Sequence, residues 1–223
     1  MTHIIPHGDT APPLDGNWDS DTWRPVTPLS INHFHARSSE HHPRVQARLV
    51  HANRALHVLF RVHDRFVKAA CTRYGQMVCK DSCVEIFLQP KPDAGYLNFE
   101  VNCGGTMLVW YVRDTTLTAT GRFKDFTEVP ADLAGGVSIF HSMPAHVPQE
   151  TAEPLEWRVQ LAIPAAVLEA FVGPLGDFSG QAWRGNLFKC ADATSHPHWA
   201  SWNPIGEELN FHRPEHFGTL RFE

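Results

Sequence analysis

The sequence predicts an all-β protein of 223 residues, an antiparallel β-sandwich with one or two short helices. Segments of alternating polar and apolar residues recur along the chain, as in strands that bury one face. Turns rich in glycine and proline separate these segments at short intervals. Apolar residues make up 43% of the chain, which is enough for a sizeable core. Because no repeat or linker divides the chain, we expect residues 1–223 to form a single domain.

Residues 55–64 (ALHVLFRVHD) carry the clearest strand signal. Apolar residues from Leu56 to Val62 alternate with mostly polar ones, so one face is expected in the core. Residues 45–51 (VQARLVH) precede this segment across a short connection and are predicted to be its hairpin partner. By the same reasoning, further strands are expected at residues 82–89, 96–102, 106–114, 156–164, 183–192 and 217–223.

The other segments are predicted to be turns, loops and one helix. Residues 164–173 (PAAVLEAFVG) begin with proline and end with glycine, as short helices often do. Residues 91–95 (KPDAG) and the glycines at 104–105 are expected to turn the chain between strands. Residues 113–155 show the least regular pattern and are predicted to form long loops.

Composition argues against several classes of function. The formal net charge is −5 and the 19 lysines and arginines are scattered, so no nucleic-acid partner is expected. No apolar run approaches the roughly 18 residues of a membrane span. We recognise no signal peptide, so we expect a cytoplasmic location, or an extracellular one if a leader was removed. Five cysteines without a CxxC pair favour free thiols. The oligomeric state stays open.

Glu85 is the most unusual residue of the predicted strands, because it lies among apolar residues in KDSCVEIFLQP, residues 80–90. Strand alternation directs Val84 and Ile86 toward the core and Glu85 toward the opposite face. A carboxylate there needs water, a cation or a ligand, because burying it without a partner is costly.

The next predicted strand, residues 96–102 (YLNFEVN), could continue the same surface with its polar face. The residues of that face are Tyr96, Asn98, Glu100 and Asn102. Sugar hydroxyls both donate and accept hydrogen bonds, and carboxylates, amides and a phenol match them. A saccharide ligand is one interpretation of this surface, and an ordinary solvated sheet face is the other.

Seven tryptophans are a second indication of sugar binding. Trp110 and Trp157 lie in alternating strand segments and are expected in the core. Trp199 and Trp202 lie in HPHWASWNPIGEE, which is rich in turn residues. A tryptophan on a loop can offer a flat apolar face to a sugar ring, although loop tryptophans also fold back into cores.

Together these segments resemble the family 9 carbohydrate-binding modules of the DOMON-like superfamily, and more narrowly the stand-alone bacterial proteins similar to them. The matching segments, in the expected order, are DGNWDSDTW, ALHVLFRVHD, KDSCVEIFLQP, YLNFEVNCGG, WRVQLAIP, WRGNLFKCAD and SWNPIGEELNFHRPEHFGTLRF. The resemblance implies a sandwich of the immunoglobulin-like jelly-roll type. It also implies a non-catalytic protein that binds a glycan end between aromatic rings, of the kind that accompanies xylan-degrading domains in polysaccharide catabolism.

The resemblance further implies which residues bind the sugar. They are the strand glutamate and asparagine, their polar neighbours and a stacking tryptophan: Glu85, Asn102, Tyr96, Asn98, Glu100 and Trp202. Two positions depart from the family pattern. Cys79 stands where an aromatic residue is common, and Glu100 stands where sugar-binding members carry an arginine. A two-sided aromatic clamp would therefore need another ring, such as that of Tyr74.

Relatives in this family bind structural calcium through loop oxygens. The resemblance gives Asp64, Asp81 and Asp93 suitable positions for calcium, although no DxDxD run is present.

Two other functions stay open. A glycoside hydrolase could use Glu85 and Glu100 as a carboxylate pair, and the distance between the two groups would decide its mechanism. A haem module, as in other DOMON-like domains, would need a methionine and a histidine as ligands to the iron.

Overall fold

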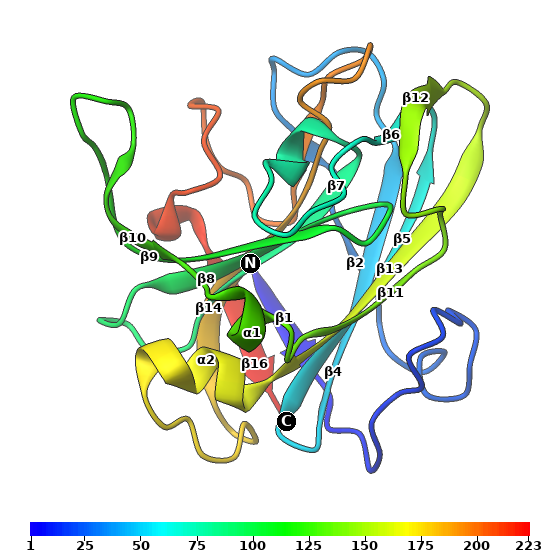
Figure 1. The fold of residues 1–223 in the computed structure, drawn as a ribbon. Helices are drawn as coiled ribbons and strands as arrows, with labels where there is room; N and C mark the ends of the chain where they lie inside the picture. Colours follow the sequence, from blue (N-terminus) through cyan, green and yellow to red (C-terminus); the bar gives the residue numbers. More distant parts are fainter.

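The computed structural model describes residues 1–223, and it confirms the predicted β-sandwich (Figure 1). The strands of the larger sheet are β1 (Thr2–Ile5), β3 (His33–Phe34), β7 (Cys83–Gln89), β8 (Tyr96–Asn102), β9 (Met107–Leu117), β10 (Phe123–Glu128), β14 (Ala182–Cys190), β15 (Trp199–Ser201) and β16 (Gly218–Phe222). The smaller sheet consists of β2 (Leu29–Ser30), β4 (Arg44–Ala52), β5 (Ala55–Asp64), β11 (Ser138–His141) and β13 (Leu155–Pro164).

The strand order explains how distant segments meet. The larger sheet runs β1-β16-β14-β7-β8-β9-β10, with β15 beside β14 and β3 beside β15. The smaller sheet runs β11-β13-β5-β4-β2, and β6 (Val67–Ala69) forms a separate ribbon with β12 (Val147–Thr151). The pairs are antiparallel except that β1 runs parallel to β16.

The main core lies between the two sheets and contains 41 buried residues. Strand alternation builds it as predicted, because Val84, Ile86 and Leu88 of β7 point into it together with Leu56 and Phe60 of β5. Trp157 of β13 is also fully buried in this core, as predicted.

The predicted helix is confirmed as α2 (Ala165–Val172). Pro164 precedes it, and Gly173 ends it with a φ of 71°, a left-handed conformation that glycine adopts without strain. Two 3₁₀ turns, η1 (Val78–Lys80) and η2 (Pro214–His216), lie near the functional region described below.

The prediction of long loops over residues 113–155 is wrong. This stretch contains the end of β9, all of β10, β11 and β12, and the single-turn helix α1 (Ala131–Ala134). Its strands carry mixed burial because they lie at sheet edges, so they lack the clean alternation of the central strands.

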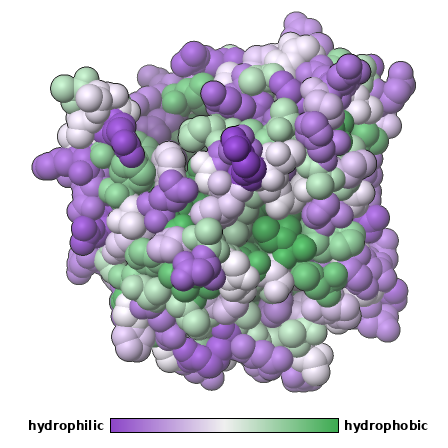
Figure 2. Space-filling view, in the orientation of Figure 1, coloured by the Kyte–Doolittle hydropathy of each residue, from purple (hydrophilic) through white to green (hydrophobic).

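The surface is mostly polar around a few apolar areas. On the face drawn in Figure 2, hydrophobic residues gather near the centre and hydrophilic residues dominate the rim. Large hydrophobic side chains are exposed at only five positions: Met1, Ile4, Leu14, Met77 and Leu117. None of the helices is both long and apolar enough to span a bilayer.

The outer face of the larger sheet is covered in part by residues 203–217 (orange to red in Figure 1). Ile205 and Phe217 of this segment pack on Phe87, Tyr96 and Phe188 of the sheet to form a second, smaller apolar cluster. This covering segment creates one wall of the pocket described next.

Candidate functional site

A pocket of about 290 Å³ opens on the outer face of the larger sheet. Its floor comes from strands β7, β8, β9 and β14, and its walls come from η1, β15 and the segment before η2. The lining residues are Met77, Cys79, Glu85, Glu100, Trp110, Cys190, Asp192, Trp199, Leu209, Asn210, Phe211 and His212.

Glu85 and Glu100 form the centre of the floor. They are directly opposite each other in the antiparallel β7–β8 register, and Phe188 of β14 lies on the other side of Glu85. Side chains at opposite positions of neighbouring strands project to the same face, so both carboxyl groups point away from the core. The structure thus brings these two predicted site residues together in one pocket.

Both carboxyl groups are almost fully enclosed, with 2% of Glu85 and 4% of Glu100 exposed. Glu85 Oε1 accepts a hydrogen bond from Cys190 Sγ at 3.1 Å, and Glu100 Oε1 accepts one from Asn98 Nδ2 at 2.6 Å. None of the ion pairs of the protein involves Glu85 or Glu100. Each carboxyl group therefore keeps one oxygen without a partner in the protein.

This enclosure changes the acidity of the pair. Burial raises the pKa of Glu100 to about 7. Burial, together with the nearby Glu100, raises the pKa of Glu85 well above its ordinary value. Burial also raises the pKa of Asp192 at the rim. No lysine or arginine is among the lining residues, and the buried Lys189 opposes the rise in the pKa of Glu85 only in part.

Aromatic rings form the walls. Trp199 donates from Nε1 to Asp192 Oδ1 at 2.7 Å, a bond that fixes the orientation of its ring. Phe211 stacks on Phe188, with ring centroids 4.2 Å apart. Trp110 also lines the pocket, which corrects the prediction that it belongs to the core. It lies opposite Asn98 in the β8–β9 register and so shares the outer face of the sheet.

Trp202 differs from the prediction that it offers its ring to a ligand. It is only 6% exposed and belongs to the main core. Its ring lies so close to Gly218 that a Cβ there would be 2.7 Å from it. Trp199 and Trp202 are three residues apart, so an extended chain points them to opposite faces. That spacing was the available signal that only one of them could reach the pocket.

The other predicted residues lie around the pocket and do not line it. Asn102 is saturated: its Nδ2 donates to Asp81 Oδ2 and to the carbonyl of Cys71, and its Oδ1 accepts from the backbone of Gly104 and Thr106. An amide with four bonds has no capacity left for a sugar hydroxyl.

Asn98 and Tyr96 are also engaged. Asn98 bridges Glu100 and the backbone N–H of Trp110, so it positions both of these lining residues. Tyr96 shares a hydrogen bond of 2.8 Å between its hydroxyl and His212 Nδ1. Burial lowers the pKa of His212 to about 3, so this ring is neutral.

Tyr74 does not supply the missing ring. Its hydroxyl donates to the carbonyl of Val129, and its ring packs beside the main core. Cys79 does line the pocket, at the position where the family pattern led us to expect a ring. Asp192 and His212 were missed because they come from loops, and strand alternation carries no information about the path of a loop. Trp199 was considered together with Trp202, and it lies in the short strand β15.

The three aspartates considered for calcium do not form a site. Asp93 is exposed in a turn, and Asp81 accepts from the backbone N–H of Cys71 and from Asn102. Asp64 is buried and accepts from His41 at 2.7 Å and from Trp157 at 3.1 Å.

Asp64 already has a cation beside it. Lys189 Nζ lies 3.6 Å from Asp64 Oδ2, with both side chains fully buried. Although burial acts to raise the pKa of Asp64, Lys189 and His41 hold it well below its ordinary value. Calcium needs six or more oxygen ligands, and the ammonium group of Lys189 already pairs with Asp64, so these residues do not fit calcium.

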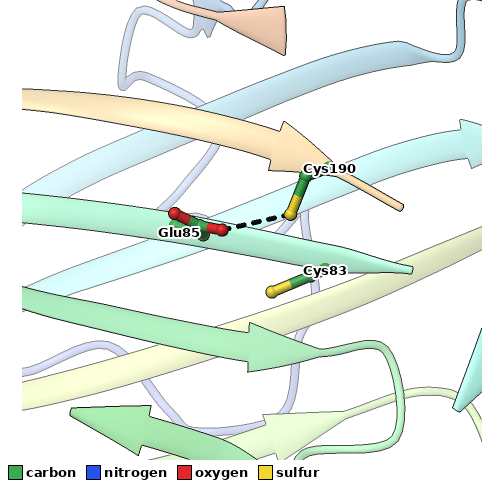
Figure 3. Close-up of side chains that lie close together, drawn as sticks. All are labelled: Cys83, Glu85 and Cys190. Atoms are coloured by element: carbon green, nitrogen blue, oxygen red, sulfur yellow. Dashed lines mark hydrogen bonds between the residues drawn. The ribbon is translucent and has the colours of Figure 1, made fainter. Parts of the chain in front are cut away.

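Three other side chains do converge like metal ligands. Figure 3 shows Cys83 and Glu85 on β7 and Cys190 on β14, with the bond between Glu85 and Cys190 dashed. One ligand atom of each lies within 4.8 Å of the others, and all three are buried. Burial raises the pKa of Cys83 to about 12 and that of Cys190 well above its ordinary value, so both thiols are protonated. Thiols suit zinc and not calcium.

Comparisons with known proteins agree with the fold. The sequence profile of carbohydrate-binding family 9 matches residues 24–222. Among curated proteins, no sequence match is found.

Solved structures give the same picture. A Bacteroides uniformis protein described as carbohydrate-binding has 25% sequence identity and a TM-score of 0.86, and the match covers 100% of this chain and 99% of that one. A family 9 carbohydrate-binding module of Caldicellulosiruptor kristjanssonii, solved with glucose, has 16% identity and a TM-score of 0.64 over 100% of this chain and 96% of that one. A family 9 module of the same organism, solved with cellotriose, has 16% identity and a TM-score of 0.65, and the match covers 100% of this chain and 94% of that one.

Proposed function

Since this chain belongs to carbohydrate-binding family 9, we propose that it binds the end of a saccharide chain, without catalysis, in the pocket over Glu85 and Glu100. One observation carries the proposal: the pocket joins two carboxyl groups to two tryptophan rings. Rings cover the apolar faces of a sugar, and carboxyl oxygens bind its hydroxyls. Glucose and cellotriose complexes of modules with the same fold support it.

Within this proposal, Trp199 and Trp110 replace Trp202 as the residues that contact the sugar ring. Glu85 and Glu100 bind hydroxyls, while Asn98 and Tyr96 position the lining residues. Cellulose and xylan, the polysaccharides that the resemblance implies, supply the first oligosaccharides to test. The pocket volume of about 290 Å³ suits one or two sugar rings, so the rest of the oligosaccharide would extend into solvent.

The test is calorimetric titration with glucose, cellotriose and xylotriose. We expect saturable binding that weakens more than about ten-fold in Trp199→Ala, which equals about 1.4 kcal/mol. Phe66→Ala is the matched control, since Phe66 is an aromatic residue outside the pocket, and it should bind like the wild type. Absence of heat with all three sugars would overturn the proposal, as would unchanged affinity in Trp199→Ala.

Hydrolysis is tested on the same samples. The carboxyl pair at the floor is the feature that the hydrolase hypothesis needs, so the sugars are analysed by chromatography after long incubation. We expect cellotriose and xylotriose to remain intact. Shortened products that form with the wild type and not with Glu85→Gln would show that the protein is a hydrolase.

A further inference from the structure

The pocket is an unusually acidic environment for a neutral ligand. Glu85, Glu100 and Asp192 all line it, and no lysine or arginine does. The thiols, the phenol and the imidazole around them are neutral. Burial raises the pKa values of the Cys79, Cys83 and Cys190 thiols and of the Tyr96 hydroxyl, and it lowers that of His212. A ligand entering the pocket therefore meets three carboxyl groups with no cation among the lining residues, and Lys189, which pairs with Asp64, only partly opposes the rise in the pKa of Glu85.

The two central carboxyl groups are built into rigid strands and are available to a ligand. Glu85 and Glu100 face each other across β7 and β8, each more than nine-tenths buried and each with one oxygen lacking a protein partner. Elsewhere the protein pairs a buried carboxylate with a cation, as Asp64 is paired with Lys189. The Glu85–Glu100 pair, in contrast to Asp64, forms no ion pair with a cation of the protein.

The walls are also suited to a cation. Trp110 and Trp199 line the same pocket as the carboxyl pair, and Phe211 adds a third ring. Tryptophan faces attract ammonium groups through their negative quadrupole, and this attraction grows when water is excluded. Enclosed carboxylates form their strongest hydrogen bonds with charged donors. Both features favour the same ligand group, a protonated amine.

We propose that the saccharide bound by this protein is an amino sugar, whose protonated amine lies between Glu85 and Glu100 while its ring packs against Trp199. The inference rests on the proposed function and narrows its ligand class. Glu85, Asp192 and the tryptophans contact the sugar ring and its remaining hydroxyls. Glu100 is then the residue that selects the charged sugar.

The test compares three hexoses that differ only at carbon 2: glucose, glucosamine and N-acetylglucosamine. Titrations run at about pH 6.5, where an amine with a pKa near 7.7–8.0 is still protonated. We expect glucosamine to bind at least about ten-fold more tightly than glucose, a difference of about 1.4 kcal/mol. N-acetylglucosamine, which carries no charge, should bind no more tightly than glucose.

Variants assign the effect to Glu100. Glu100→Gln keeps the size of the side chain and an oxygen that can accept from Asn98. It should lose far more affinity for glucosamine than for glucose, so that the variant binds the two sugars with similar affinity. Glu153→Gln removes an exposed carboxylate outside the pocket and should keep the preference.

A second readout is the number of protons released on binding, measured by repeating the titration in buffers of different ionisation enthalpy. Pairing with an amine should deprotonate the carboxyl pair, so glucosamine releases protons and glucose does not. Equal affinity for glucose and glucosamine would overturn the inference and leave the proposed function standing. No binding of any sugar would overturn both. If Glu100→Gln lowered the affinity for glucose and the affinity for glucosamine by the same factor, the inference would also be overturned.

Discussion

Glu85 and Glu100 lie opposite each other on neighbouring strands and line the same pocket, with no basic side chain among its lining residues. Two enclosed carboxyl groups on directly opposite strand positions cannot both ionise without a large cost, so the charged form of one favours the protonated form of the other. The pair therefore links the stability of the fold to pH.

Glu100 should make the protein less stable as pH rises. Its pKa is raised to about 7 in the folded state, against 4.5 ordinarily, so the folded state binds the proton more tightly. The free energy of unfolding then falls between about pH 4.5 and pH 7, by on the order of 2–3 kcal/mol. Glu100→Gln should flatten this slope, and denaturant unfolding at a series of pH values measures it. The exposed control Glu153→Gln should keep the wild-type slope, and a wild-type slope in Glu100→Gln would contradict the assignment.

Trp199 and Trp202 should separate binding from folding. Trp199→Ala removes a pocket wall and should lower sugar affinity more than about ten-fold with little change in melting temperature. Trp202→Ala empties part of the main core and should cost about 3–5 kcal/mol of unfolding free energy. Calorimetry and thermal unfolding of both variants measure the two effects. A stable Trp202→Ala protein with no sugar affinity would restore Trp202 as the binding residue.

Asn102 should matter for stability and not for the ligand. Asn102→Ala leaves the N–H groups of Gly104 and Thr106 without their acceptor, so it should cost about 2–4 kcal/mol. Sugar affinity of the folded fraction should stay within a few-fold of the wild type. The exposed Asn32→Ala should cost less than about 0.5 kcal/mol. A folded Asn102→Ala protein without sugar affinity would show that the amide contacts the ligand.

Lys189 should be essential to the buried ion pair. Lys189→Met leaves Asp64 without its cation and should cost about 3–5 kcal/mol of unfolding free energy. Adding Asp64→Asn to that variant should restore part of the loss, because the uncompensated charge is then gone. Denaturant unfolding of the single and double variants measures this coupling. Additive losses would show that the two groups do not interact.

Calcium should have no effect on the fold. Asp64 is engaged by Lys189, and Asp81 is engaged by Asn102, so neither carboxylate is free to bind an ion. Melting temperature and sugar affinity should be the same in EDTA and in millimolar calcium. A rise in melting temperature with calcium that EDTA reverses would contradict this expectation.

Strand alternation was sufficient to predict the central part of the fold. It located the strands that became β5, β7 and β8, and it assigned Glu85 and Glu100 to one outer face. The alternation is strong there because one face of each of these strands is part of the main core of 41 buried residues. Edge strands such as β10 and β12 lack that constraint, and the prediction of loops failed at them.

Features that depend on distant pairing could not be predicted. The two-residue strand β3 exists only because it pairs with β15, and β1 exists only because it pairs with β16. Asp192 and His212 reach the pocket from loops whose paths depend on packing over the sheet. The sequence does not specify these contacts locally, although it does contain the spacing that separates Trp199 from Trp202.

The parallel pairing of β1 with β16 also determines how the molecule bears a mechanical load. Thr2 lies beside Thr219 and Ile5 beside Phe222, so the chain enters the sheet at one end of this ladder and leaves it at the other. A force that stretches the protein between its two termini pulls these strands past each other. Their hydrogen bonds then share the load in shear and do not open one at a time. Held by its ends, the protein should resist extension most strongly at this pair of strands, and the sugar pocket should stay intact until they part.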